Sequence, residues 1–178
     1  MDTRSRARRY VLAVLAVGVG AFAVGSAVAP AQTGQAAAKR ITGAGVGAVK
    51  IGKTFQELRA DGLVGRIRKG CELAANTRSA RLLAPLSGSV NFTQSTPRKV
   101  TDIAIRGGAR ARGVGIGAKI PRIKAAFPKA KVDRSTERVF GITLVKIPKN
   151  GGGRIQFAVS TTTKRTTVIG VPFIAFCE

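Results

Sequence analysis

Two similar stretches decide the fold: VKIGKTFQELRA at residues 49–60 and VGIGAKIPRIKA at residues 114–125. They lie 65 residues apart, and the same offset extends toward the end of the chain. Without a gap, it aligns Gly88 with Gly153, Phe92 with Phe157, and Lys99 with Lys164. Matches at both ends of one fixed register indicate a duplicated unit. We therefore predict repeat unit 1 at residues 49–112 and repeat unit 2 at residues 113–178.

Each stretch predicts a short helix that begins after a glycine turn. In unit 1, residues 54–57 match a capping box, in which Thr54 and Glu57 satisfy each other's backbone amides. In unit 2, Pro121 suits the first helical turn and Pro128 stops the helix. Helices this short are not stable alone, so both must pack on a sheet.

Extended segments follow each helix. In unit 2, apolar and β-branched runs at residues 139–147, 154–159 and 166–175 predict three strands. Unit 1 has counterparts at residues 89–93 and 100–105, with a weaker one at residues 73–83. The sequence thus predicts an α+β fold of two tandem units, each a short helix plus an antiparallel β-meander, with one sheet possible across both.

The helix motif carries a family resemblance. The pattern V-x-I-G-x(2)-[FI]-x(2)-[LI]-[RK]-A, followed by a strand meander, resembles the repeat unit of tandem-repeat β-lactamase-inhibitor-like proteins. It is also similar to the small α+β domain of outer-membrane assembly lipoproteins. Over residues 49–178 this resemblance implies an exported, non-enzymatic protein that binds other proteins through a sheet face and its loops. The chain has no Trp and a single Tyr, so it lacks the aromatic sheet face of the inhibitors. We therefore do not predict that this chain inhibits a β-lactamase.

Residues 1–31 have the pattern of a bacterial-type secretory signal peptide. Four arginines precede an uncharged apolar stretch at residues 11–29, and Ala27-Val28-Ala29 offers small residues for cleavage. An uncleaved membrane anchor is the alternative, because the apolar stretch approaches the length of a bilayer span. Residues 32–48 are rich in Ala, Gly and Gln and predict a flexible linker. We expect a secreted or envelope-associated protein with no transmembrane span after cleavage.

Cys71 and Cys177 are the only cysteines. In an oxidising exterior we expect them to form a disulfide that ties unit 1 to the end of unit 2, with free buried thiols as the alternative. Two cysteines cannot form a four-thiolate zinc site, and the absence of histidine excludes histidine triads and histidine metal ligands. We predict no catalytic residues, no cofactor and no metal ion.

One formal motif has a simpler explanation. Residues 47–54 match the phosphate-binding loop pattern G-x(4)-G-K-[ST]. The Val-Lys-Ile at its centre favours an extended strand over a tight loop around phosphates. A glycine turn that leads into the Thr54 helix cap accounts for the same residues, so we predict no nucleotide site.

Positive charge is the main functional signal. The chain has 31 Lys and Arg against 8 Asp and Glu, a formal net charge of +23. Arg78 and Arg81 are part of this excess. The candidate anion- or partner-binding residues form three groups: Arg66, Arg68 and Lys69 after the first helix, Arg106, Arg110 and Arg112 at the join between the two units, and Lys119, Arg122 and Lys124 around the second helix. Such a field attracts polyanions, although a solvated surface selected for solubility is the alternative.

These observations predict a secreted, non-enzymatic binding module with a strongly basic surface. Its expected partner is an extracytoplasmic protein or an anionic lipid or polymer of the cell envelope. Export and the scarcity of aromatic stacking residues argue against nucleic acid. The alternative function is a specific proteinaceous inhibitor of an extracellular enzyme.

The export prediction is tested by the intact mass of the exported protein. We expect the mass of a chain that lacks residues 1–29 or 1–31, and two alkyl groups added only after reduction. A full-length mass, or alkylation without reduction, would contradict these expectations.

Overall fold

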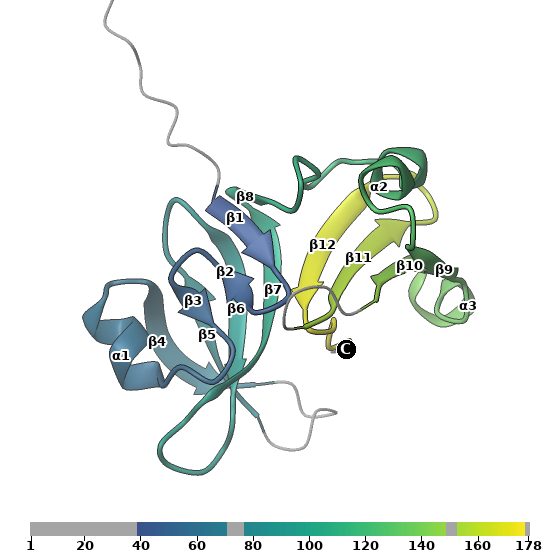
Figure 1. Cartoon of the computed structure of the whole chain (residues 1–178). Coiled ribbons are helices and arrows are strands. Elements are labelled where there is room, and N and C mark those ends of the chain that lie inside the picture. Colours follow the sequence, from purple (N-terminus) through teal and green to yellow (C-terminus); the bar gives the residue numbers. More distant parts are fainter. Residues whose placement is uncertain (1–38, 71–76, 149–152, 177–178) are drawn as a thin grey trace, which may run out of the picture. The chain divides into compact units, whose positions relative to one another are not determined.

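The computed structural model describes residues 39–70, 77–148 and 153–176, all within one compact unit. Its main feature is an antiparallel sheet of eight strands (Figure 1). In spatial order the strands are β4 (Val64–Lys69), β5 (Arg78–Leu82), β6 (Ser87–Phe92), β7 (Val100–Gly107), β12 (Thr166–Val171), β11 (Ile155–Ser160), β10 (Ile142–Ile147) and β9 (Lys131–Asp133).

A second sheet and three helices complete the described part of the chain. The second sheet has the order β3 (Val49–Lys50), β2 (Gly45–Val46), β1 (Lys39–Thr42) and β8 (Ala109–Arg110), with β1 and β8 parallel. The helices are α1 (Phe55–Ala60), α2 (Ile120–Ala126) and α3 (Glu137–Phe140).

The α+β prediction, with two tandem helix-plus-meander units, is wrong. The described residues are 47% strand and 13% helix, and the fold is β-sandwich-like. One physical reason is that residues 39–48, which we expected in a flexible linker, contain β1 and β2 instead. Ile41 and Val46 are buried in the core, so this segment is a structural layer and the fold begins before Val49.

The helix signals and most strand signals are found where the sequence predicts them. Both short helices form, and Pro121 lies in the first turn of α2. The run at residues 139–147 is not one strand, because Glu137–Phe140 form α3 and β10 starts only at Ile142. Gly141 separates the two with a φ of 63°, in the left-handed region that favours glycine.

The centre of the large sheet is the antiparallel pair β7 and β12. Ile103, Ala104 and Ile105 lie opposite Val171, Gly170 and Ile169, respectively. Strands β4–β7 therefore form one half of the sheet and β9–β12 the other. The two halves have mirrored strand order, with the last strand of each at the centre.

The turn before each helix is fixed to the last strand of its own half. In the first half, the Gly52 N–H donates to the Val100 carbonyl at 2.9 Å, and the Val100 N–H donates to Lys53. In the second half, the Gly117 N–H donates to the Thr166 carbonyl at 2.8 Å. Gly52 and Gly117 both have a φ of 84°, so a glycine is required at each turn.

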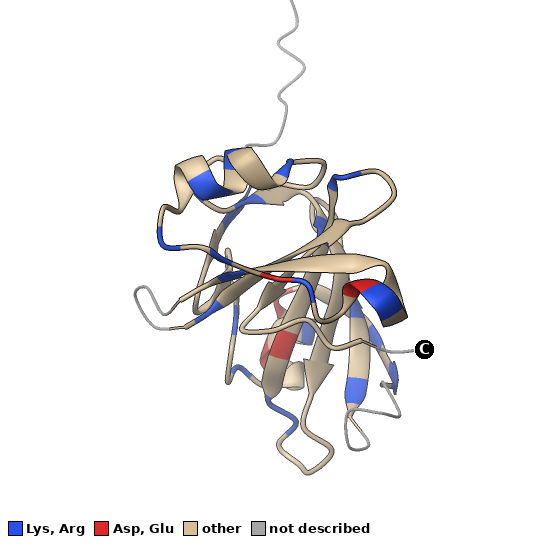
Figure 2. Ribbon diagram, turned by 90° about the vertical axis from the view of Figure 1, so that its right-hand side faces the viewer, with Lys and Arg blue, Asp and Glu red and all other residues tan. Residues whose placement is uncertain are grey.

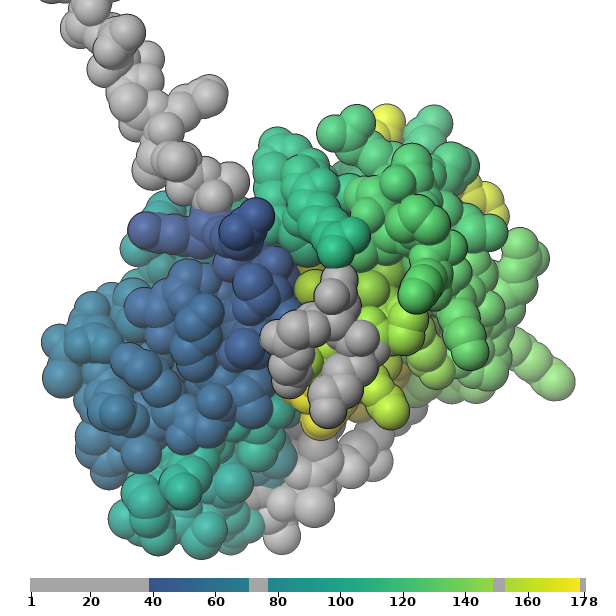
Figure 3. Space-filling view, viewed as in Figure 1, coloured from purple at the N-terminus to yellow at the C-terminus, as the bar shows by residue number. Residues whose placement is uncertain are grey.

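One face of the large sheet forms the main core. Its largest fully buried side chains come from both halves and include Phe92, Phe157 and Ile103. Leu58 of α1 and Ile123 of α2 pack into the same cluster, as do Val46 and Val49 of the small sheet. Figure 3 shows the residues of β1–β3 and α1 (purple to blue) at the surface of the molecule. Burial of this apolar surface is the main stabilising term of the fold.

The other face of the second half is covered by the C-terminal segment. Leu144, Ala158 and Val168 form a small apolar cluster, against which Ile174 and Phe176 pack. Close approach of this segment requires Gly170, because a Cβ there would collide with Ile174 and with the Phe173 carbonyl. The C-terminal segment thus covers the apolar part of this face, and the ion pair of Lys146 with Asp133 lies at its edge.

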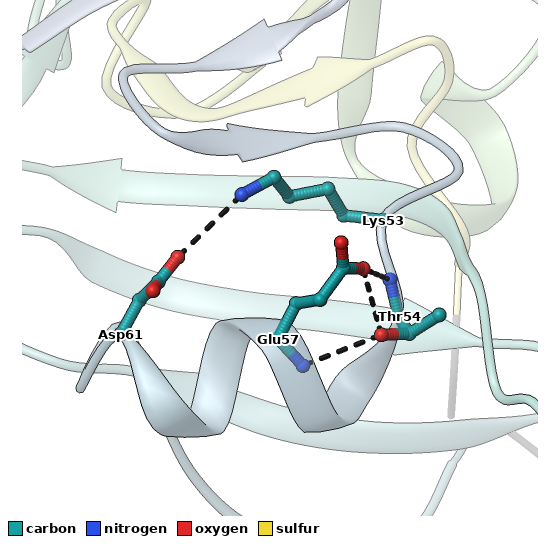
Figure 4. A network of polar contacts seen from close by, with 4 residues as sticks. All are labelled: Lys53, Thr54, Glu57 and Asp61. Atoms are coloured by element: carbon teal, nitrogen blue, oxygen red, sulfur yellow. Dashed lines mark hydrogen bonds and ion pairs between the residues drawn. The ribbon is translucent and has the colours of Figure 1, made fainter.

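The N-terminus of α1 shows the predicted capping box (Figure 4). The Glu57 N–H donates to the Thr54 hydroxyl at 3.3 Å, and the Thr54 N–H donates to the Glu57 carboxylate at 2.7 Å. These hydrogen bonds lower the pKa of Glu57, mainly through the Thr54 backbone. The cap fixes a helix of only six residues, and this helix carries the buried Leu58.

Removing this cap tests its contribution to the fold. We expect Thr54→Ala to lower the free energy of unfolding by about 1 kcal/mol, because one helix amide loses its acceptor. Thr54→Ser keeps the hydroxyl and serves as the matched control. Urea unfolding of the three proteins measures the difference, and equal stability of Thr54→Ala and the wild type would contradict the assignment.

Candidate anion-binding site

Strand alternation makes the two faces of β4–β7 chemically different. On β5, Leu82 points into the core, so Ser79 and Arg81 lie on the opposite face. Direct cross-strand pairing puts Arg68 of β4 beside Ser79 and Ser89 of β6 beside Arg81. This arrangement places arginine and serine side chains together on the exposed face of the first half.

A depression of about 360 Å³ lies on this face. The cationic residues that line it are Arg68, Lys69, Arg81 and Arg106. Its hydroxyl groups come from Ser79, Ser87 and Ser89. Among the described residues, no Asp or Glu lines it, so this described lining presents positive charge and hydrogen-bond donors.

The arginines of the depression have no anionic partner in the described part of the chain. The ion pairs found there are Lys53 with Asp61, Arg134 with Glu137, and Lys146 with Asp133. Within residues 39–70, 77–148 and 153–176, the side chains of Arg68, Arg81 and Arg106 also make no hydrogen bond. Their donors are available to an external ligand.

A bulge shapes one wall of the depression. The register between β6 and β7 shifts at Ser87 and Gly88. Gly88 has a φ of 135°, and a Cβ there would collide with the Ala104 carbonyl. Only glycine allows this close approach of the two strands, so the positions of Ser87 and Ser89 are set by the backbone.

A buried carboxyl group lies on the same face outside the depression, two strands away from Ser79. Asp102 of β7 is 3% exposed, and it lies opposite Asn91, which in turn lies opposite Ser79. The Asn91 Nδ2 donates to Asp102 at 2.7 Å, and the Thr101 hydroxyl donates at 3.0 Å. Burial raises the pKa of Asp102, while these two hydrogen bonds lower it by less.

The remaining predicted basic residues do not join this group. Figure 2 shows Lys and Arg (blue) spread over many elements, with few Asp and Glu (red). Arg66 is exposed on β4 outside the depression, and Arg122 and Lys124 are exposed on α2. Lys119 is the N-cap of α2 and lines a separate depression that also contains Glu137. The basic residues that are clustered in the sequence therefore lie on several separate surfaces of the folded protein.

Arg110 and Arg112 have structural partners. The Arg112 guanidinium lies 5.2 Å from the centre of the Phe127 ring, and it donates to the Ala126 carbonyl at 3.5 Å. Arg110 donates to the Gly113 carbonyl at 3.4 Å. The Arg112 contacts hold the turn after β8 to the end of α2, and the Arg110 contact lies within that turn, so both arginines have fewer donors for a ligand.

Sequence reasoning identified Arg68, Lys69 and Arg106 but did not assign Arg81 or the serines to the site. The signal for them is the sequence RSARL on β5, in which Ser79 and Arg81 alternate with apolar residues. Cys71 and Cys177 lie outside the described residues. Within the described ranges, no cluster of three or more metal-ligating side chains is present and no helix is long and apolar enough to cross a membrane.

No protein-family model matches the chain, and no match to it is found among curated proteins or solved structures. The family resemblance drawn from the helix motif therefore stays a hypothesis. The function has to be argued from the chemistry of the site.

The buried Asp102 gives a pH-dependent contribution to stability. The pKa of Asp102 is higher in the folded state than in the unfolded state, where it is about 3.9. Its contribution to the free energy of unfolding is therefore fully present below about pH 3.9. This contribution is lost as the pH rises through the pKa of the folded state. We expect Asp102→Asn to be more stable than the wild type at neutral pH, with the advantage vanishing in acid. Urea unfolding between pH 3 and pH 7 measures this, and a constant difference between the two proteins would contradict it.

Proposed function

We propose that this protein is a secreted, non-enzymatic binding module that holds an anionic polymer of the cell envelope on the exposed face of β4–β7. The observation that carries the proposal is the depression with three arginines that have no anionic partner among the described residues. Guanidinium groups bind oxyanions through paired, charge-assisted hydrogen bonds, and serine hydroxyls add further donors.

The net charge of the chain supports an anionic ligand. At +23, its long-range field draws anions toward the surface and accelerates their association. Charge alone gives no specificity, but the depression concentrates three arginines, one lysine and three hydroxyls at one place on the sheet. A repeating anion can engage this place while its neighbouring charges interact with the rest of the basic surface.

The site chemistry supports binding rather than catalysis. The chain has no histidine, and no carboxylate of the described residues lines the depression. Among the described residues that line the depression, Ser79, Ser87 and Ser89 therefore have neither a histidine nor a carboxylate as a general base, and a serine hydroxyl without a base is a weak nucleophile. As donors, the same hydroxyls need no activation.

The proposed location follows from the sequence. An anionic envelope polymer is met outside the cytoplasmic membrane, where the predicted signal peptide would deliver the protein. The face of the second half is occupied by the C-terminal segment, so the face of the first half is the part of this sheet surface with open polar donors. A protein ligand is the alternative outcome of the test below.

Binding of poly(glycerol phosphate) to the secreted protein tests the proposal. We expect binding at low ionic strength that weakens as salt is raised to about 0.15 M, since the contacts are electrostatic. The variant Arg81→Gln/Arg106→Gln should bind about tenfold or more weakly, because two charge-assisted contacts are lost. The matched control is Arg122→Gln/Lys124→Gln on α2, which removes the same charge outside the depression and should weaken binding much less than the Arg81→Gln/Arg106→Gln variant.

Two results would contradict this proposal. Equal weakening by both double variants would show that net charge alone drives binding. No binding of the polymer, together with salt-insensitive capture of a single extracellular protein by the same face, would favour a protein ligand.

A further inference from the structure

We infer that Arg68 and Arg81 form a discrete site for a phosphate group supplied by the ligand. The inference deepens the proposed function and rests on it, because it names the chemical group that the anionic polymer would present. It comes from a difference between the two halves of the large sheet.

Three positions on the first half have direct counterparts on the second. Arg68 lies on the edge strand β4, opposite Ser79, and Arg81 is two residues further along β5. In the second half, Asp133 lies on the edge strand β9, opposite Leu144, and Lys146 is two residues further along β10. Each member of the second set stands 65 residues after its counterpart: Asp133 after Arg68, Leu144 after Ser79, and Lys146 after Arg81.

In the second half the protein supplies both charges. The Lys146 Nζ donates to the Asp133 carboxylate and forms an ion pair with it. The Ser135 N–H donates to the same carboxylate at 2.9 Å. Both contacts, chiefly the one from Lys146, hold the pKa of Asp133 well below its usual range. The cation on β10 is thus neutralised by a carboxylate on the edge strand.

In the first half the carboxylate is replaced by a second cation. Arg68 stands where Asp133 stands, so Arg68 and Arg81 are diagonal neighbours of like charge. Diagonal cross-strand neighbours are within reach of long side chains, and like charges there repel. An anion bound between the two arginines would offset this repulsion, just as Asp133 neutralises the charge of Lys146 in the second half.

The first half is also open where the second is closed. Leu144 belongs to the cluster against which Ile174 and Phe176 pack. Its counterpart Ser79 instead lines the depression and presents a hydroxyl group. An external group can therefore reach the position between Arg68 and Arg81.

The number of donors favours phosphate over carboxylate. Arg68, Arg81 and Arg106 each carry five N–H donors, and Ser79 and Ser89 each add one hydroxyl donor. A carboxylate offers two oxygens and one negative charge. A tetrahedral phosphate offers up to four oxygens, and the three arginines, which have no anionic partner in the described part of the chain, suit its higher charge.

Inorganic phosphate is the direct probe, with binding followed by titration of the secreted protein at low ionic strength. The informative variant is Arg68→Asp, which installs the carboxylate found at the equivalent position of the second half. We expect Arg81 to pair with this aspartate, and phosphate affinity to fall about tenfold or more because the site then holds its own anion. Arg122→Asp on α2 has the same change in net charge and should bind phosphate like the wild type.

A second variant keeps the charges and separates this inference from folding defects. Ser79→Ala/Ser89→Ala should weaken phosphate binding relative to glutarate, a dicarboxylate, while polymer binding at low salt remains. Unfolding midpoints of all variants are compared, and Arg68→Asp should be at least as stable as the wild type because two like charges at diagonal positions are replaced by opposite charges.

The outcomes distinguish the inference from the proposed function. If Arg68→Asp folds and binds phosphate like the wild type, or if glutarate binds as tightly as phosphate, the phosphate site is refuted. The polymer could still bind in that case, with an affinity that falls with added salt and in the Arg81→Gln/Arg106→Gln variant. The proposed function would then stand without the phosphate site. Displacement of bound phosphate by poly(glycerol phosphate) supports the polymer as the source. Stronger displacement by phosphatidylglycerol vesicles would overturn that source in favour of a lipid headgroup.

Discussion

The antiparallel pairing of β7 with β12 is the constraint on which the rest of the structure depends. It joins two four-stranded halves into one sheet, and Ile103 and Ile105 of one half then share a buried layer with Ile169 and Val171 of the other. Because side chains alternate along a strand, fixing this buried layer also fixes what lies on the opposite face. There, Ala104 and Gly170 form the border between a polar first half and an apolar second half.

The two halves use equivalent frameworks for different chemistry. Each contributes four strands to the large sheet and has a glycine turn that is bonded to its last strand; the first half contains α1, and the second contains α2 and α3. The second half closes its outer face with the C-terminal segment and pairs Lys146 with Asp133. The first half leaves Arg68, Ser79 and Arg81 exposed or half-buried around a depression. This difference between the halves is the basis for proposing that the first half binds an anion from outside.

Local signals in the sequence were sufficient for the helices and for several strands. The capping box at Thr54 and Glu57 and the helix-starting Pro121 are short-range patterns that work in any fold. Residues 39–48 were misassigned because their Ala and Gly content is typical of linkers, whereas Ile41 and Val46 are held by tertiary contacts that no local pattern contains. Because this segment forms strands of a second sheet, the fold is β-sandwich-like and not the predicted α+β.

The site was only partly predictable from the sequence. Arg68, Arg81 and Arg106 line the same depression because of the strand register, and they are not close together in the sequence.

The central claim is that one face of β4–β7 binds the anion, and residue-by-residue chemical-shift mapping tests it most directly. Poly(glycerol phosphate) would be added to the isotope-labelled, secreted protein at low ionic strength, and the backbone amide signals followed. The account predicts that the largest shifts fall on Arg68, Ser79, Arg81, Ser89 and Arg106, with small shifts on α2. Shifts centred on α2, or spread evenly over every basic surface, would contradict it.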